Sequence, residues 1–198
     1  MFREVHIAEE TFRIPKKIWQ IWIHENKQPI QNWRESSDTW TELNPGWDYV
    51  YAVMNHSSAG AYVQEASKER QEVVDAFMRA NETIHKADFL RYLLLLERGG
   101  VYADLDTRCV KAVDDWIPPR YRHNTGLVIG IEINDYLEGN YDLGKPYIQL
   151  CQWTIMARPH HPVIEKVVNS VIGRLYDWEA DIMEITGPQV SRFIPAPT

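Results

Sequence analysis

Two aspartates separated by one residue, Asp104 and Asp106, follow a short apolar segment in the stretch GGVYADLDT at residues 99–107. Two like charges this close repel each other, and the burial of either one without a partner is costly. A positive charge is therefore expected between them. Mg²⁺ and Mn²⁺ commonly take one or two protein carboxylates and leave their other positions to water and substrate phosphates. We therefore expect a divalent metal that holds a diphosphate at this pair.

A second candidate pair, Asp88 and Arg91, lies in the apolar segment that precedes the aspartates. Residues three apart share one face of a helix, so these two side chains can meet. One interpretation is a salt bridge that locks the helix. The other is that Arg91 binds phosphate or sugar oxygens while Asp88 accepts hydrogen bonds from sugar hydroxyls. Spacing alone favours neither interpretation.

Other residues allow further hypotheses. An apolar strand followed by Asp-x-Asp also begins the nucleophile motif of haloacid-dehalogenase-like phosphatases. In such an enzyme Asp104 would attack phosphate with Mg²⁺ nearby. Arg108 stands at the last position of the motif and counts against this alternative. Glu132, at the end of an apolar run, could position an acceptor or be structural. His160 and His161 stand between prolines at a helix start, where capping is favoured over metal binding.

The elements that must position these groups alternate between strands and helices, which indicates an α/β fold. We expect strands at residues 14–23, 48–53, 101–106 and 126–132, the last one buried on both faces. We expect helices at residues 31–47, 58–80, 84–98, 147–157 and 162–178, the first of them stopped at Asn44-Pro45-Gly46. If the strand at 101–106 keeps its geometry to its end, Asp104 and Asp106 face the same side. Ligands of open α/β sheets bind beyond such strand ends.

Composition limits the class of partner. Of the 198 residues, 44% are hydrophobic and 25% are charged, as in a soluble globular protein, and the formal net charge is −7. This charge argues against nucleic acid as the main partner because no basic surplus displaces counterions. The two cysteines, Cys109 and Cys151, make no disulfide framework, and we expect two free thiols.

Several segments together resemble a known family. KADFLRYLLLLERGGVYADLDT at residues 86–107 resembles the core motif of the sugar-binding DXD glycosyltransferases. IPKKIWQIW near the start, GLVIGIE, QLCQWTIMARPHHPV and DIMEITGP resemble, in the same order, segments of the fungal initiating alpha-1,6-mannosyltransferases of the Golgi. The resemblance reaches from Ile14 to Pro188.

The resemblance implies a GT-A-like nucleotide-sugar-binding fold with a single mixed sheet flanked by helices. It also implies GDP-mannose as donor, Mn²⁺ or Mg²⁺ as metal, and transfer with retention of configuration. By matching motif, Asp104 and Asp106 would bind the metal, while Asp88 and Arg91 would hold the donor sugar and its phosphates. The further residues that the resemblance places at the donor are Tyr102 in the aspartate motif, Trp19 and Gln20 near the nucleotide, and Gly187 and Pro188 bordering the donor or acceptor site.

From this resemblance we expect residues 1–198 to form one glycosyltransferase domain, with residues 1–13 as a lead-in. Relatives of this type continue past the TGP turn, so we expect the C-terminal part to be truncated. The expected reaction is mannose transfer from GDP-mannose to a mannose-containing N-glycan in the Golgi lumen, with any membrane anchor in a segment outside this chain. The alternatives are mannosylation of inositol-phosphate ceramide and a non-catalytic subunit that binds nucleotide-sugar.

Overall fold

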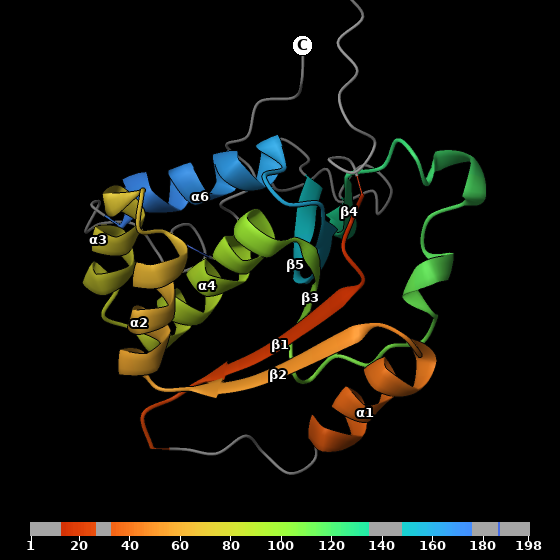
Figure 1. The fold of residues 1–198 in the computed structure, drawn as a ribbon, viewed down its shortest axis with the longest axis horizontal. Coiled ribbons are helices and arrows are strands. Elements are labelled where there is room, and N and C mark those ends of the chain that lie inside the picture. The colour runs from red at the N-terminus through yellow and green to blue at the C-terminus, as the bar shows by residue number, and fades with distance from the viewer. Residues whose placement is uncertain (1–12, 27–32, 135–147, 176–185, 187–198) are drawn as a thin grey trace, which may run out of the picture.

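A mixed five-stranded β-sheet forms the centre of the molecule (Figure 1). The structure is a computed structural model, and it describes residues 13–26, 33–134, 148–175 and 186. The order of strands across the sheet is β2-β1-β3-β5-β4. The strands are β1 (Lys17–Ile23), β2 (Asp48–Met54), β3 (Gly100–Ala103), β4 (Leu127–Asn134) and β5 (Ile148–Ala157).

The sheet joins a parallel half to an antiparallel half at β3. Strand β1 runs parallel to both β2 and β3, whereas β5 runs antiparallel to both β3 and β4. Asp104 and Asp106 therefore follow the carboxyl end of the strand at which the two halves meet. The expectation of a single mixed sheet flanked by helices is confirmed.

Helices cover both faces of the sheet. On one face α2, α3, α4 and α6 enclose the larger apolar core, whereas α1 and a short 3₁₀ turn, η2, cover the other (Figure 1). A second 3₁₀ turn, η3, lies in the connection between β3 and β4. The helical segments are α1 (Trp33–Leu43), α2 (His56–Ala66), α3 (Gln71–Arg79), α4 (Thr83–Arg98), η2 (Val113–Asp115), η3 (Pro119–Tyr121) and α6 (Pro162–Arg174).

The junction between α4 and β3 needs its two glycines. Gly99 ends α4 with φ +64°, and Gly100 begins β3 with φ +99°, a region that side chains other than glycine rarely adopt. A Cβ on Gly100 would lie 2.5 Å from the backbone oxygen of Lys17 on β1. The glycine pair thus lets α4 turn directly into the central strand.

Within the described residues, no helix combines the length and apolar character needed to cross a membrane.

Two predicted elements are wrong in type or number. Residues 58–80 form two helices because the polar segment between them turns, with the N–H of Arg70 donating to the oxygen of Ser67 at 2.8 Å. In the segment expected as a helix at residues 147–157, Ile148–Ala157 form strand β5. Periodicity does not separate a short apolar helix from a buried strand, and here pairing with β3 on one side and β4 on the other decides the outcome.

Two predicted strands differ in extent or burial. The strand expected at 101–106 ends at Ala103, so its alternation does not reach the aspartates. The strand expected to be buried on both faces, β4, lies at the edge of the sheet, and Ile131 on it is 57% exposed. The apolar composition of β4 therefore does not reflect a central, parallel position.

Candidate active site

The two aspartates lie in a turn that follows β3. The N–H of Asp104 donates to the oxygen of Trp153 at 2.8 Å, and the oxygen of Asp104 accepts from the N–H of Thr107 at 3.1 Å. Because the strand has ended, a turn and not a shared strand face sets the relation of the two carboxylates. The Asp104 side chain is 31% exposed, and Asp106 is exposed. One carboxylate is thus held by the protein while the other faces outward.

Arg91 connects the two acidic groups that the sequence singled out. Its Nη2 lies 2.6 Å from Asp88 Oδ1 and 3.4 Å from Asp104 Oδ1. The hydroxyl of Tyr102 donates to the same Asp104 oxygen at 2.7 Å, and the Arg91 guanidinium lies 5.1 Å from the centre of the Tyr102 ring. The salt-bridge interpretation of Asp88 and Arg91 is confirmed, and the bridge extends to the aspartate pair.

Burial controls the protonation of this cluster. It raises the pKa of both Asp88 and Asp104 above the ordinary range, and the charge of Arg91 opposes the rise at each of them. Burial also favours a neutral Arg91, but its attraction to Tyr102, Asp104 and Asp88 outweighs this, so the pKa of Arg91 rises. The pKa of the buried Tyr102 lies well above its usual value, which keeps the hydroxyl a donor. The cluster is therefore a charged arginine held between two acids.

Gln20 fixes the backbone of the aspartate turn from β1. It is fully buried, and its Nε2 donates to the oxygen of Asp104 at 2.9 Å while its Oε1 accepts from the hydroxyl of Tyr49 at 2.6 Å. Trp19 is 9% exposed, and its indole N–H donates to the oxygen of Gly99 at 2.8 Å. Both residues lie within β1, and their proposed contact with a nucleotide stays a prediction.

Three residues that the sequence analysis missed complete the surroundings of Asp88. The hydroxyl of Thr186 donates to Asp88 Oδ2 at 3.0 Å. The hydroxyl of Tyr92 lies 3.0 Å from Gln152 Oε1 and 3.2 Å from the oxygen of Thr186. A buried tyrosine hydroxyl needs a partner, so Tyr92 beside Arg91 was an available signal. Thr186 belongs to the ITGP segment, whose Gly187 and Pro188 lie outside the described residues.

The remaining sequence candidates have defined positions. Glu132 is exposed on β4, and its Oε2 accepts from Gln149 Nε2 at 2.8 Å. His161 caps α6, with its Nδ1 accepting from the N–H of Val163 at 3.2 Å, as expected from its place beside proline. Cys109 and Cys151 are free, as expected, and both are buried. In the part of the chain that is described, no group of three or more His, Cys, Asp or Glu side chains could hold a metal.

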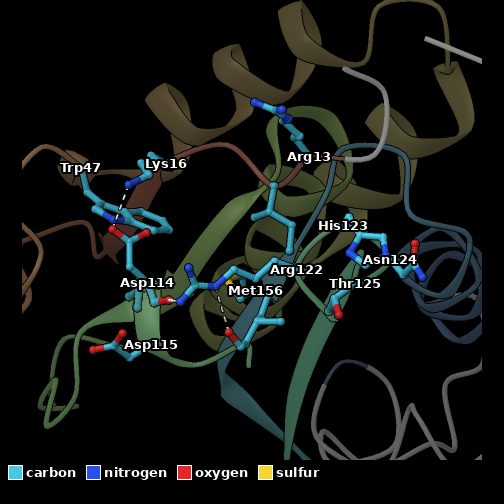
Figure 2. A pocket seen from close by; sticks show the side chains of 13 residues that line it. Arg13, Lys16, Trp47, Asp114, Asp115, Arg122, His123, Asn124, Thr125 and Met156 are labelled. Carbon is cyan, nitrogen blue, oxygen red and sulfur yellow. Dashed lines mark hydrogen bonds and ion pairs between the residues drawn. The ribbon is translucent and has the colours of Figure 1, made fainter. Parts of the chain in front are cut away.

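A pocket of about 1050 Å³ lies elsewhere, at the edge where β1 and β2 begin (Figure 2). Lys16 and Trp47 line it from the residues before those strands. Three of its charged side chains are already engaged: Lys16 Nζ lies 2.8 Å from Asp114 Oδ2, and Arg122 donates to the backbone oxygens of Ile117 and Asp114. This pocket is separate from the aspartate pair, which follows the opposite end of β3.

Comparison with known proteins supports the resemblance. Residues 31–122 match the family described as the glycosyltransferase sugar-binding region containing a DXD motif. The chain is 33% identical over 171 residues to the initiation-specific alpha-1,6-mannosyltransferase of Candida albicans, over 82% of this chain and 44% of that protein. It is 26% identical over 182 residues to a mannosyl phosphorylinositol ceramide synthase of Saccharomyces cerevisiae, over 91% of this chain and 41% of that protein. The chain thus spans less than half the length of these relatives.

A solved structure supports the fold. The chain superimposes on the PaToxG glycosyltransferase with a TM-score of 0.62 and 21% sequence identity, over 90% of this chain and 67% of that chain. At this identity the likeness concerns the fold, and it confirms the GT-A-like architecture. The matched region at residues 31–122 includes Asp88, Arg91 and both aspartates of the turn. The chain therefore matches the DXD-containing glycosyltransferase family over residues 31–122, and its similarity to the mannosyltransferase of Candida albicans extends over 82% of its length.

Proposed function

We propose that this chain transfers mannose from GDP-mannose to a mannose-containing N-glycan, forming an alpha-1,6 linkage with retention of configuration. The observation that carries the proposal is the buried linkage of Asp88, Arg91 and Asp104 at the carboxyl end of β3. The name of the Candida albicans relative supports the choice of sugar and linkage. Localisation in the Golgi lumen belongs to the same proposal and rests on the resemblance to the Golgi enzymes.

The aspartate turn suits a divalent metal. The two described hydrogen bonds to the Asp104 carboxylate come from Arg91 and Tyr102, and both reach Oδ1. These bonds fix the orientation of the carboxylate and leave Oδ2 without a hydrogen bond from either residue. Asp106 adds an exposed carboxylate two residues later. Two hard oxygen donors, one partly exposed and one exposed, fit Mn²⁺ or Mg²⁺, which take their remaining ligands from water and phosphate. When bound, such a cation would neutralise charge on the diphosphate leaving group.

Arg91 and its neighbours have defined roles in this proposal. Loss of the diphosphate from the sugar places negative charge on phosphate oxygens, and a fixed cation nearby stabilises that charge. Arg91 is held in place by Asp88, and its buried Nε and Nη1 have no hydrogen-bond partner among the described residues. In this proposal the charged guanidinium would lie near the phosphates, while Asp88 holds Arg91 and Tyr102 holds the Asp104 carboxylate.

The acceptor hydroxyl would attack the sugar from the side of the leaving group, and the departing phosphate would take its proton. This route needs no protein nucleophile. The transition state would carry oxocarbenium character, as in glycoside hydrolysis. The role of the described residues is then to orient the diphosphate and to stabilise its charge.

A second acceptor class is inositol-phosphate ceramide. The observation that favours it is the likeness to the mannosyl phosphorylinositol ceramide synthase over 91% of this chain. The same donor site would serve either acceptor. A non-catalytic subunit that binds nucleotide-sugar is the alternative from another class, and it predicts donor binding without transfer.

Calorimetric titration of GDP, with and without Mn²⁺, tests the donor site. We expect metal-dependent binding of GDP, weaker binding of UDP, and loss of binding in Asp106→Asn. Asp106 is exposed, so the variant should fold normally. Asp115→Asn is the matched control, because Asp115 is also an exposed aspartate but lies in η2. Absence of metal-dependent GDP binding, or equal loss in Asp115→Asn, would contradict the proposed donor site.

A further inference from the structure

Trp153 is an exposed tryptophan beside the aspartate turn. It is 37% exposed, whereas every other tryptophan in the described part of the chain is buried or half-buried. A large aromatic ring left in water forgoes the stabilisation that burial would give it. Trp153 is on β5, the strand that the sequence analysis took for a helix, so its position became visible only in the structure.

The sheet register places Trp153 directly across from Asp104. Tyr102 pairs with Ile155 and Ala103 pairs with Thr154, so the next pair in the ladder is Asp104 with Trp153. The hydrogen bond from the N–H of Asp104 to the oxygen of Trp153, at 2.8 Å, continues this ladder. The backbone of Trp153 therefore lies beside that of Asp104, whose carboxylate would hold the metal and diphosphate.

A bulge in β5 presents this residue. Ile129 pairs with Ile155 and Ile131 pairs with Leu150, so the segment Cys151–Thr154 lies opposite the single residue Gly130. Cys151, within this segment, is buried, and its burial raises the pKa of the thiol. Bulges occur often beside active sites, where they redirect a side chain. The strand thus has a local irregularity at the point where it meets the aspartate turn.

We propose that Trp153 is a stacking platform for a mannose ring at the reaction centre. The inference rests on the proposed function, in which the diphosphate lies at Asp104. The apolar C–H face of a pyranose packs well against an indole, and an exposed ring next to the diphosphate is placed to receive it. Two sources can supply this ring, the sugar of the donor and the terminal mannose of the acceptor. Trp153 is thus a specificity determinant that needs no charge.

Kinetics of Trp153→Ala, Trp153→Phe and wild type test the platform and identify the source of the ring. Each protein is assayed for transfer to a high-mannose N-glycan, for hydrolysis of GDP-mannose without acceptor, and for GDP affinity with Mn²⁺. We expect Trp153→Ala to lose about tenfold or more in kcat/KM for transfer, with GDP affinity unchanged, and Trp153→Phe to recover most of the loss. If the ring belongs to the acceptor, hydrolysis persists in Trp153→Ala; if it belongs to the donor, hydrolysis falls with transfer.

The matched control is Tyr121→Ala, which removes an aromatic ring that is 49% exposed from η3, in the connection between β3 and β4. It should leave transfer unchanged. Transfer by Trp153→Ala within about twofold of wild type would overturn the platform, and so would a Trp153→Phe variant as slow as Trp153→Ala. A loss of GDP affinity in Trp153→Ala would also overturn it, because the residue would then act through the fold of the turn.

A readout independent of activity separates this inference from the proposed function. Saturation-transfer NMR reports contact between the protein and the mannose protons of two ligands, the same N-glycan with GDP and GDP-mannose alone, each in the presence of Mg²⁺. Contact with either ligand in wild type that is lost in Trp153→Ala supports the platform, even if no protein transfers mannose from GDP-mannose. Contact with both ligands that is equal in wild type and Trp153→Ala overturns the platform, even if wild type is an active transferase.

Discussion

Replacement of Asp88 by asparagine should leave the charge of Arg91 poorly compensated inside the protein. The Arg91 and Asp88 side chains are only 5% and 7% exposed, and their closest atoms are 2.6 Å apart. Asp88→Asn keeps the shape of the side chain and an oxygen that can still accept from the hydroxyl of Thr186. The substitution therefore removes the charge of Asp88 and changes little else.

The cost follows from the burial of the pair. Removal of one partner from a buried ion pair costs about 3–5 kcal/mol, because the other charge stays buried. Asp104 remains 3.4 Å from Arg91 and compensates part of the charge. Burial already raises the pKa of Asp88, so its ionised form is itself costly to the folded state. We therefore expect a loss at the lower end of the range, about 3 kcal/mol of unfolding free energy.

Urea unfolding measures this loss. For an m-value of about 2–3 kcal/mol/M, a loss of about 3 kcal/mol lowers the midpoint by about 1–1.5 M. The matched control is Asp114→Asn, because Lys16 and Asp114 are 2.8 Å apart but their side chains are 59% and 53% exposed. Exposed pairs contribute about 1 kcal/mol or less. Equal, small losses in the two variants would refute the inference that Asp88 and Arg91 form a buried pair.

Two further predictions concern the fold around the site. Gly100→Ala should lower the unfolding free energy by about 2 kcal/mol or more, because its φ of +99° and the Lys17 oxygen at 2.5 Å leave no room for a Cβ. Gly173→Ala in α6 is the control: a Cβ there would have no atom within 4 Å, so the substitution should cost no stability. Thermal melting of both variants measures the difference. His161→Asn should reduce the pH dependence of stability. Burial lowers the pKa of His161, and its Nδ1 caps α6 only when neutral, so wild type loses stability as the pH falls below about 6.5 towards that lower pKa. Asparagine caps without titrating, and an unchanged slope of stability against pH in urea unfolding would contradict the capping role.

The sequence was a good guide where the signal is local. The spacing of Asp88 and Arg91 on an apolar helix predicted their contact, and α4 places them as expected. The change from helix to strand expected between residues 98 and 101 falls at the glycine pair before β3. Each of these inferences depends on residues close in the chain, whose relation helix geometry fixes directly.

The sequence was a poor guide where distant segments decide the structure. Thr186 lies 98 residues from Asp88, and no local pattern announces their hydrogen bond. Strand β5 has a composition that fits a helix or a buried strand, and only its pairing with β3 and β4 distinguishes them. The same pairing produces the bulge that places Trp153, so the error in secondary structure concealed a candidate residue of the site.

Asp104 shows why a short motif does not determine a site. Its side chain is bound by Tyr102 from β3 and by Arg91 from α4. Its backbone is bound by Gln20 from β1 and by Trp153 from β5. Of these four partners only Tyr102 lies within two residues of Asp104 in the chain. The other three belong to elements that meet only in the folded sheet. An Asp-x-Asp sequence on another fold would lack Arg91, which compensates the charge of Asp104, and Gln20, whose amide binds the Asp104 carbonyl. It would also lack Trp153, whose carbonyl accepts from the Asp104 N–H. The short motif alone would therefore not be an equivalent site for the proposed sugar transfer.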